Sequence, residues 1–303
     1  MTVIRISTAI AVLLIIGTSY LANSQAAIPS DLASMIQGFQ STDRETRAHA
    51  FKSLTEALPP PKGDYHVRRD LAFSDSLSQL EPNKSGAIKK ALIDLLQREQ
   101  ALKVSQRAAE RVQTLAEAEG PDKPEDSSEE NEDDYYESLL FDVASLVDER
   151  ALPLLVKELS TGNIVARGVA RFGSIAVQPV ISEADDAKSD TMNRLACPSA
   201  LSLMLQTRSV TLEDNPSEHQ LIKRAALRWT TASDFGLRVS NAYLLAQIND
   251  ADTIRALQTM ATDDPQVAVD VNGETRHYGR EAAQNELKLL GTKLGKGFFV
   301  RPM

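Results

Sequence analysis

The stretch Ser41-Thr42-Asp43-Arg44-Glu45-Thr46-Arg47-Ala48-His49-Ala50 decides the fold, because its spacing of Asp43 and Arg47 recurs along the chain. The spacing is an Asp, or once an Asn, with an Arg four residues later at the predicted start of a helix. Its members are Asp43 with Arg47, Asp64 with Arg68, Asn163 with Arg167, Asp190 with Arg194 and Asp234 with Arg238. The 22 Asp and 20 Arg residues would give about one or two Asp/Arg pairs at this spacing by chance. The chain holds five, although Asp94/Arg98 lies inside a long predicted helix and is not counted as a repeat.

This spacing has a physical meaning at the start of a helix. An Asp at the N-cap accepts hydrogen bonds from first-turn amides that otherwise lack partners. An Arg one turn later lies on the same side, where it can pair with that Asp or with a neighbour. The third residue after the Arg is small and the seventh is often Leu, as in Ala50/Leu54, Cys197/Leu201, Asn241/Leu245 and, after Arg280, Ala283/Leu287. Small residues there allow adjacent helices to approach closely.

Three segments carry a resemblance to the HEAT-like repeat family, in particular to the short bacterial repeats also found in phycobilin lyases. They are Ser41–Ala50, the stretch from Asp148-Glu149-Arg150-Ala151-Leu152-Pro153 to Arg167, and Asp234-Phe235-Gly236-Leu237-Arg238 running into Asp250–Leu257. The resemblance implies an α-solenoid, in which each pair of helices buries its apolar faces against the next pair. A role in handling a tetrapyrrole chromophore is a further implication.

Helical periodicity dominates the remaining sequence, and no alternating strand pattern is evident, so we predict an all-α protein. A signal segment occupies residues 1–26, and helical repeats follow in residues 27–118, including a long helix over 87–118. Residues 119–136 are predicted to be an acidic, flexible linker. A second block of HEAT-like repeats then spans 137–303, with an insertion at 264–278. The α-solenoid is therefore either continuous or split into two short stacks joined by the linker.

The net charge of −9 is local. Residues 117–137 hold eleven acidic residues and one Lys, which leaves the rest of the chain nearly neutral. Nucleic-acid binding requires clustered Lys and Arg to displace counterions from phosphate, so the sequence predicts no nucleic-acid partner.

The N-terminal residues read as an export signal. Arg5 precedes an apolar run at residues 9–16, and small residues lead to a predicted cleavage site after Ala26. The mature protein is then secreted or periplasmic. The alternative is an uncleaved anchor, because residues 6–22 are uncharged and reach about 17 residues, the lower limit for spanning a bilayer. Membrane attachment is expected only in that case, for a tethered structural protein.

No catalytic or metal-binding pattern is evident. Cys197, the one cysteine, occupies the small position after Arg194, which predicts a buried thiol rather than a nucleophile or attachment point. The four His residues are scattered singly, and the acidic run lacks the glycine turn of a calcium loop. We therefore expect no enzyme activity, no metal and no cofactor.

The repeat register predicts which residues face solvent on the second helix of each pair. These are the second, fifth and ninth residues after the Arg, and they form a surface suited to a protein or peptide partner. The binding candidates at these positions are His49, Lys52, Tyr243, Gln247 and Asn285. Tyr243 is the strongest anchor candidate because exposed Tyr is enriched at interface hot spots. The alternative is that Tyr243 packs against a neighbouring repeat. The sequence thus favours an exported binding protein acting as an adaptor or scaffold.

Overall fold

A computed structural model of the chain describes residues 32–62, 69–116, 128–265, 268–269, 273 and 275–293. The chain divides into two compact units, residues 1–146 and 147–303, called unit 1 and unit 2 below. The predicted export signal lies outside the described residues. Among the helices that the structure describes, none combines the length and the apolar character needed to cross a membrane.

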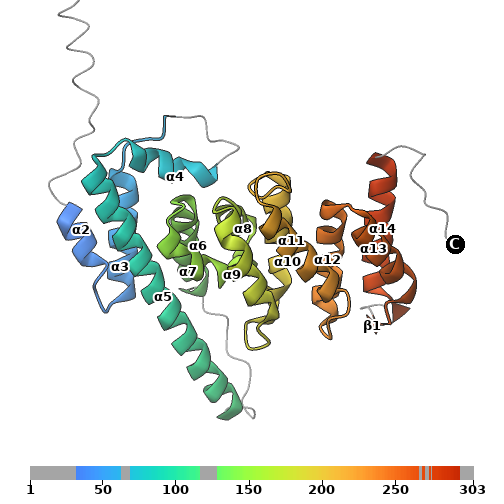
Figure 1. The fold of residues 1–303 in the computed structure, drawn as a ribbon. Helices are drawn as coiled ribbons and strands as arrows, with labels where there is room; N and C mark the ends of the chain where they lie inside the picture. The colour runs from blue at the N-terminus through green and yellow to red at the C-terminus, as the bar shows by residue number, and fades with distance from the viewer. Residues whose placement is uncertain are drawn as a thin grey trace, which may run out of the picture. The chain divides into compact units, whose positions relative to one another are not determined.

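Unit 1 contains five described helices: α2 (Leu32–Gly38), α3 (Arg44–Ala57), α4 (Arg69–Ser78), α5 (Pro82–Ala116) and α6 (Ser128–Ser145) (Figure 1). The α2–α3 pair is the hairpin expected from the sequence. The two helices approach closely at Gly38, where an added Cβ atom would lie only 2.6 Å from the Ala50 side chain. Helix α5 packs against α4 and α6. Its seam is buried at Ile88, Leu92 and Leu95, but Leu102 is exposed.

Unit 2 is built from short helices that follow one another in chain order (Figure 1). Its elements are the 3-10 helix η1 (Glu149–Ala151), α7 (Leu152–Val156), the 3-10 helix η2 (Leu159–Thr161), α8 (Asn163–Ala170), α9 (Ser174–Asp185), α10 (Thr191–Gln206), α11 (Pro216–Trp229), α12 (Phe235–Ile248), α13 (Ala251–Asp263), β1 (Ala268–Val269), β2 (Thr275–Arg276) and α14 (Tyr278–Lys293).

The helices of unit 2 form two layers of helix pairs. Helices α7, α9, α11 and α13 contact one another in sequence and make one layer, and α8, α10, α12 and α14 make the other. Each helix of the second layer also packs against its partner in the first, as α9 does with α10 and α13 with α14. Every pair therefore buries its apolar side chains against the next, which is the packing of a helical solenoid. The prediction of an all-α solenoid is confirmed.

Two predictions need correction. The insertion between α13 and α14 contains an antiparallel ribbon, in which Ala268 pairs with Arg276 and Val269 with Thr275, although no strand was expected. In addition, α6 begins at Ser128, inside the predicted linker 119–136, and packs on α4 and α5. The linker prediction overlooked that Tyr136, Leu139, Leu140 and Val143 give this helix a buried stripe. Residues 119–127 of the predicted linker lie outside the described residues. The boundary between units consequently lies at 146/147 rather than at 136/137.

Candidate functional site

Three Asp residues of the repeated spacing cap helices. Asp43 accepts a hydrogen bond from the Thr46 amide at 2.8 Å, and Asp190 accepts one from the Asn193 amide at 3.1 Å. Asp234 accepts two, from the second and third residues of α12. The capping role expected from the sequence is therefore confirmed at these three positions.

Two other pairs of the spacing are not confirmed as caps. Asn163 is the first residue of α8 rather than its cap, because Gly162 is the N-cap, and Arg167 is exposed. Asp64 lies outside the described residues, and so does Arg68. The repeat role of Arg68 therefore stays a prediction, and the structure describes this region only from Arg69, where α4 begins.

Arg47 is buried and does not pair with Asp43. Only 1% of its surface is exposed, and its Nη1 donates to the backbone oxygens of Ser41 and Thr42 at 3.0 and 2.9 Å. Its Nε donates to Glu99 Oε1 on α5 at 2.5 Å. The Tyr135 hydroxyl on α6 donates to the same oxygen at 3.3 Å. Burial, reinforced by the charge of Glu99, raises the pKa of Tyr135 well above its usual value. Arg47 therefore fixes the α2–α3 turn and joins three helices.

Arg238 repeats this arrangement in unit 2 with the same atoms. Its Nη1 donates to the oxygens of Ala232 and Ser233, six and five residues earlier, at 2.5 and 3.4 Å. Its Nε and Nη2 donate to the two carboxylate oxygens of Asp264 at 3.0 and 3.3 Å. Arg280 donates to the Asp264 backbone oxygen at 2.9 Å, so this residue joins α12, α13 and α14.

Arg194 links successive pairs instead of closing its own turn. Its Nε donates to the Ala184 oxygen at 3.0 Å, and its Nη1 lies 3.3 Å from Asp234 Oδ2 in the next pair. Sequence reasoning placed these Arg side chains but missed the carboxylates of Glu99 and Asp264, since neither stands at a fixed spacing from its Arg.

The small positions after each Arg are all buried, at Ala50, Cys197, Asn241 and Ala283. The Cys197 thiol donates to the Asn193 oxygen at 3.4 Å, and burial raises its pKa far above the usual value. A thiol in this state is a poor nucleophile. Among the described residues, no group of three or more His, Cys, Asp or Glu side chains could hold a metal ion.

The predicted binding residues lie on two units. His49 and Lys52 are exposed on α3 in unit 1, while Tyr243 and Gln247 on α12 and Asn285 on α14 belong to unit 2. Tyr243 is 39% exposed, and its hydroxyl accepts a hydrogen bond from Gln206 of α10. The structure brings the last three residues onto adjacent helices of one layer, because α12 packs against α14.

These three residues belong to a larger set of outward positions, none of which is charged. The second, fifth and ninth positions after Arg194, Arg238 and Arg280 are all half-buried or exposed, and none carries a charged side chain. We call this surface the neutral face; its members are Ala196, Ser199, Leu203, Ser240, Tyr243, Gln247, Ala282, Asn285 and Leu289. A quarter of all residues in the chain are charged, so about two charges would be expected among nine such positions. Leu289 is 50% exposed.

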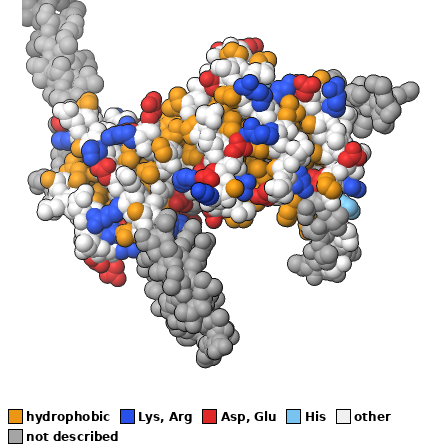
Figure 2. Space-filling view, turned by 60° about the horizontal axis from the view of Figure 1, so that its bottom comes forward, with side chains coloured by type: hydrophobic (Ala, Val, Ile, Leu, Met, Phe, Trp, Pro, Cys, Tyr) orange, Lys and Arg blue, Asp and Glu red, His pale blue; other side chains and the backbone are white. Residues whose placement is uncertain are grey.

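One face of the molecule carries mixed charge. Figure 2 shows Lys and Arg side chains interspersed with Asp and Glu over one face of the molecule, with hydrophobic side chains between them. On the described part of that face, the basic residues do not gather into one continuous patch of the kind that tracks a nucleic-acid backbone.

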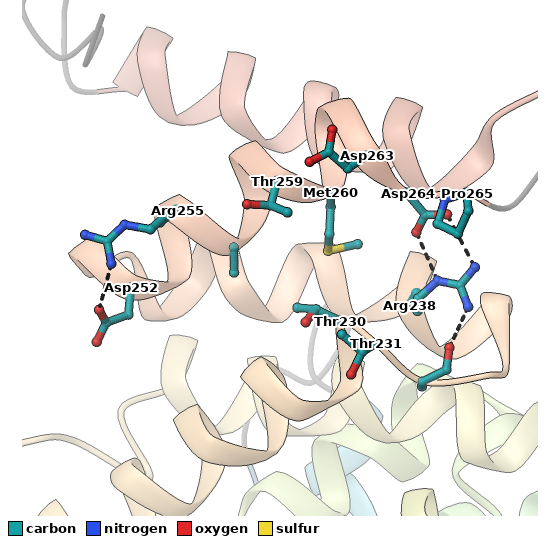
Figure 3. A pocket seen from close by; sticks show the side chains of 12 residues that line it. Thr230, Thr231, Arg238, Asp252, Arg255, Thr259, Met260, Asp263, Asp264 and Pro265 are labelled. Carbon is teal, nitrogen blue, oxygen red and sulfur yellow. Dashed lines mark hydrogen bonds and ion pairs between the residues drawn. The ribbon is translucent and has the colours of Figure 1, made fainter. Parts of the chain in front are cut away.

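A pocket of about 620 Å³ lies between the C-terminal end of α11 and α13, which lines it from Asp252 to Asp263 (Figure 3). Its floor is the Arg238–Asp264 pair, and its walls include the side chains of Thr230, Ala256 and Met260. The preceding pair of helices in this layer, α9 and α11, differs because the Trp229 indole is buried there. Its Nε1 donates to Asp185 at 2.8 Å. No aromatic side chain lines the pocket at α13.

No protein-family model matches this chain, and no curated protein matches it. Among solved structures, it is similar to an engineered protein from the Northeast Structural Genomics Consortium, at 15% identity and a TM-score of 0.38 over 87% of this chain and 97% of the other. It is also similar to computationally designed armadillo repeat proteins for modular peptide recognition, at 14% identity and a TM-score of 0.36 over 85% and 98%. Likenesses this weak carry no argument about fold or function, so the description of unit 2 as a helical repeat rests on its own helix contacts.

Proposed function

We propose that this protein is exported and acts by binding a protein or peptide partner, as an adaptor or scaffold. The observation that carries the proposal is the neutral face on α10, α12 and α14. Partner binding strips water from the centre of an interface, and an unpaired charge buried there is costly. Interface centres are accordingly depleted in charged residues and enriched in Tyr. Nine half-buried or exposed positions without a charge, with Tyr243 in the middle helix, fit this description.

The shape of the surface favours a macromolecule over a small ligand. The neutral face extends over three packed helices, and small ligands instead bind in concave pockets that enclose most of their surface. We infer that the repeats are HEAT-like because Asp43, Asp190 and Asp234 cap helices and the buried Arg side chains tie the turns together. His49 and Lys52 are proposed as further contacts from unit 1.

Site-specific photo-crosslinking tests the proposed face. A photoreactive phenylalanine analogue at Ser240 should crosslink to a discrete partner in the native compartment, because Ser240 lies on the same helix as Tyr243. The matched control places the analogue at Glu213, an exposed residue between α10 and α11. Tyr243→Lys should abolish the Ser240 crosslink by introducing a charge into the interface. Equal crosslinking from both positions, or no effect of Tyr243→Lys, would contradict the proposal.

Export is proposed from the N-terminal residues alone. Mass spectrometry of the protein isolated from its native source should find Ala27 as the first residue if the segment 1–26 is a cleaved signal. A chain that begins at Met1 and fractionates with membranes would instead support the tethered structural protein.

The chromophore-handling alternative has a direct test. Cys197 is the only thiol in the sequence and is fully buried, so attachment of a tetrapyrrole to it would require the fold to open. Absorbance spectra of the purified protein mixed with a tetrapyrrole should therefore remain those of the two separate components. A new absorbance band would favour the lyase-like alternative.

A further inference from the structure

We propose that the pocket between α11 and α13 is a second binding site, which takes a Lys or Arg side chain of a protein partner. The pocket lies in the layer of α7, α9, α11 and α13, whereas the neutral face belongs to the layer of α8, α10, α12 and α14. A protein with a binding site in each layer could hold two partners, which is what an adaptor requires.

The charges lining the pocket leave one acid without a partner. Arg238 and Asp264 neutralise each other on the floor, and Arg255 lies 3.7 Å from Asp252, which also pairs with Lys223. Asp263 lines the pocket, is exposed and has no ion-pair or hydrogen-bond partner for its carboxylate among the described residues (Figure 3). The five charged side chains that line the pocket therefore sum to −1, and the excess acid, Asp263, favours a cation.

The ends of two helices add to this preference. Thr230, Thr231 and Ala232 follow α11, and Asp264 and Pro265 follow α13, so both helices present their C-terminal ends to the pocket. The C-terminal end of a helix carries partial negative charge, which favours cations nearby. At α11 this charge is partly met by Arg238, which donates to the Ala232 and Ser233 carbonyls.

The walls fit the stem of a long basic side chain. Ala232, Ala256, Met260 and Pro265 supply apolar surface, and the threonines add methyl groups. Lys and Arg bury an aliphatic stem along apolar surface while the charged head reaches a polar group. In this arrangement the stem packs on Met260 and Ala256, and the head pairs with Asp263 near the helix ends.

The test uses the full chain labelled with ¹³C at its methionine methyl groups, with the Met260 resonance assigned from Met260→Leu. The probes are capped tripeptides, Gly-X-Gly, in which X is Lys, Arg, norleucine or Glu. The Lys and Arg peptides should shift the Met260 methyl resonance saturably and bind at least fivefold more tightly than the norleucine peptide. The Glu peptide should bind more weakly still. Higher salt should weaken only the Lys and Arg peptides, because it screens the ion pair.

Two variants identify the contacts. Asp263→Asn should weaken the Lys peptide about fivefold and leave the norleucine peptide unchanged, while the control Glu213→Gln should change neither. Ala256→Phe should fill the pocket and block all peptides while the other methionine resonances stay in place, which shows that the fold is intact. An unshifted Met260 resonance, equal binding of the Lys and Glu peptides, or equal effects of Asp263→Asn and Glu213→Gln would overturn the inference. Photo-crosslinking at Ser240 reports on the other layer, so the two proposals can fail independently.

Discussion

The α2–α3 turn of unit 1 and the α11–α12 turn of unit 2 are built alike on the inside and differ on the outside. In both, a buried Arg donates through Nη1 to the carbonyls six and five residues earlier and through Nε to a carboxylate from a later segment. The outward positions after Arg47 are His49, Lys52 and Glu56, whereas those after Arg238 are Ser240, Tyr243 and Gln247.

This comparison separates the residues that specify the fold, which are the buried Arg side chains and their partners, from the outward residues that are available for binding. A buried guanidinium must have its donors satisfied, so the Arg, its turn and its carboxylate are tied to one another. The outward positions contribute little to folding, because surface substitutions usually change stability by less than about 0.5 kcal/mol. Their chemistry is therefore free to differ, and we expect unit 1 to present a charged surface where unit 2 presents a neutral one.

The largest expected effect comes from breaking a buried pair. Arg238→Leu removes the guanidinium that pairs with the buried Asp264 carboxylate and should lower the free energy of unfolding by about 3–5 kcal/mol. Arg47→Leu should cost somewhat less, because Arg44 Nε also lies 3.8 Å from Glu99 and the Tyr135 hydroxyl still donates to it. Urea denaturation followed by circular dichroism measures both. Arg167→Leu is the matched control, because this exposed Arg should lose less than about 0.5 kcal/mol. Comparable losses from all three variants would remove the distinction between buried and exposed Arg residues.

A smaller effect should distinguish the units by pH. Burial raises the pKa of Asp142, on α6 of unit 1, to about 7 from its ordinary value of 3.8. The folded state then binds more protons at Asp142 than the unfolded state between these values, so the contribution of this group to stability is fully present below pH 4 and is lost as pH rises through 7. The half-buried side chain keeps some contact with water, which limits the loss to about 2 kcal/mol. Asp142→Asn should flatten the profile between pH 5 and 8, as measured by urea midpoints. An unchanged slope in this variant would mean that another group titrates.

The capping residues provide a finer comparison. Asp43→Ala removes a helix cap and should cost about 1 kcal/mol. Asp234→Ala removes a cap and also the carboxylate that lies 3.3 Å from Arg194, so it should cost more, about 1.5–2 kcal/mol. Thermal melting of each variant beside the parent protein checks the order. A larger loss at Asp43 would show that the contact with Arg194 is not stabilising.

Local patterns were sufficient to predict the helical fold and the caps, but not the partners of the buried Arg residues. The Asp/Arg spacing and the small third position are set within one helix, so they can be seen in the sequence. Glu99 meets Arg47 across 52 residues and Asp264 meets Arg238 across 26, and these contacts depend on tertiary packing. The pocket was missed for the same reason, since it forms between α11 and α13, which only tertiary packing brings together. Helix α6 was misjudged because the acidic composition concealed its buried stripe.

The smallest expected effect on stability falls on the neutral face, where the two regions differ most in chemistry. Tyr243→Lys places a charge on an exposed position and removes the hydrogen bond from Gln206, so we expect a loss of no more than about 0.5–1 kcal/mol. Lys52→Ala at the corresponding position of unit 1 should change stability even less. Melting temperatures of both variants, measured beside the Ser240 crosslinking yield, separate folding from binding. If Tyr243→Lys destabilised the protein as strongly as Arg238→Leu, Tyr243 would be part of the packing between repeats, and the neutral face would owe its composition to folding instead of to a partner.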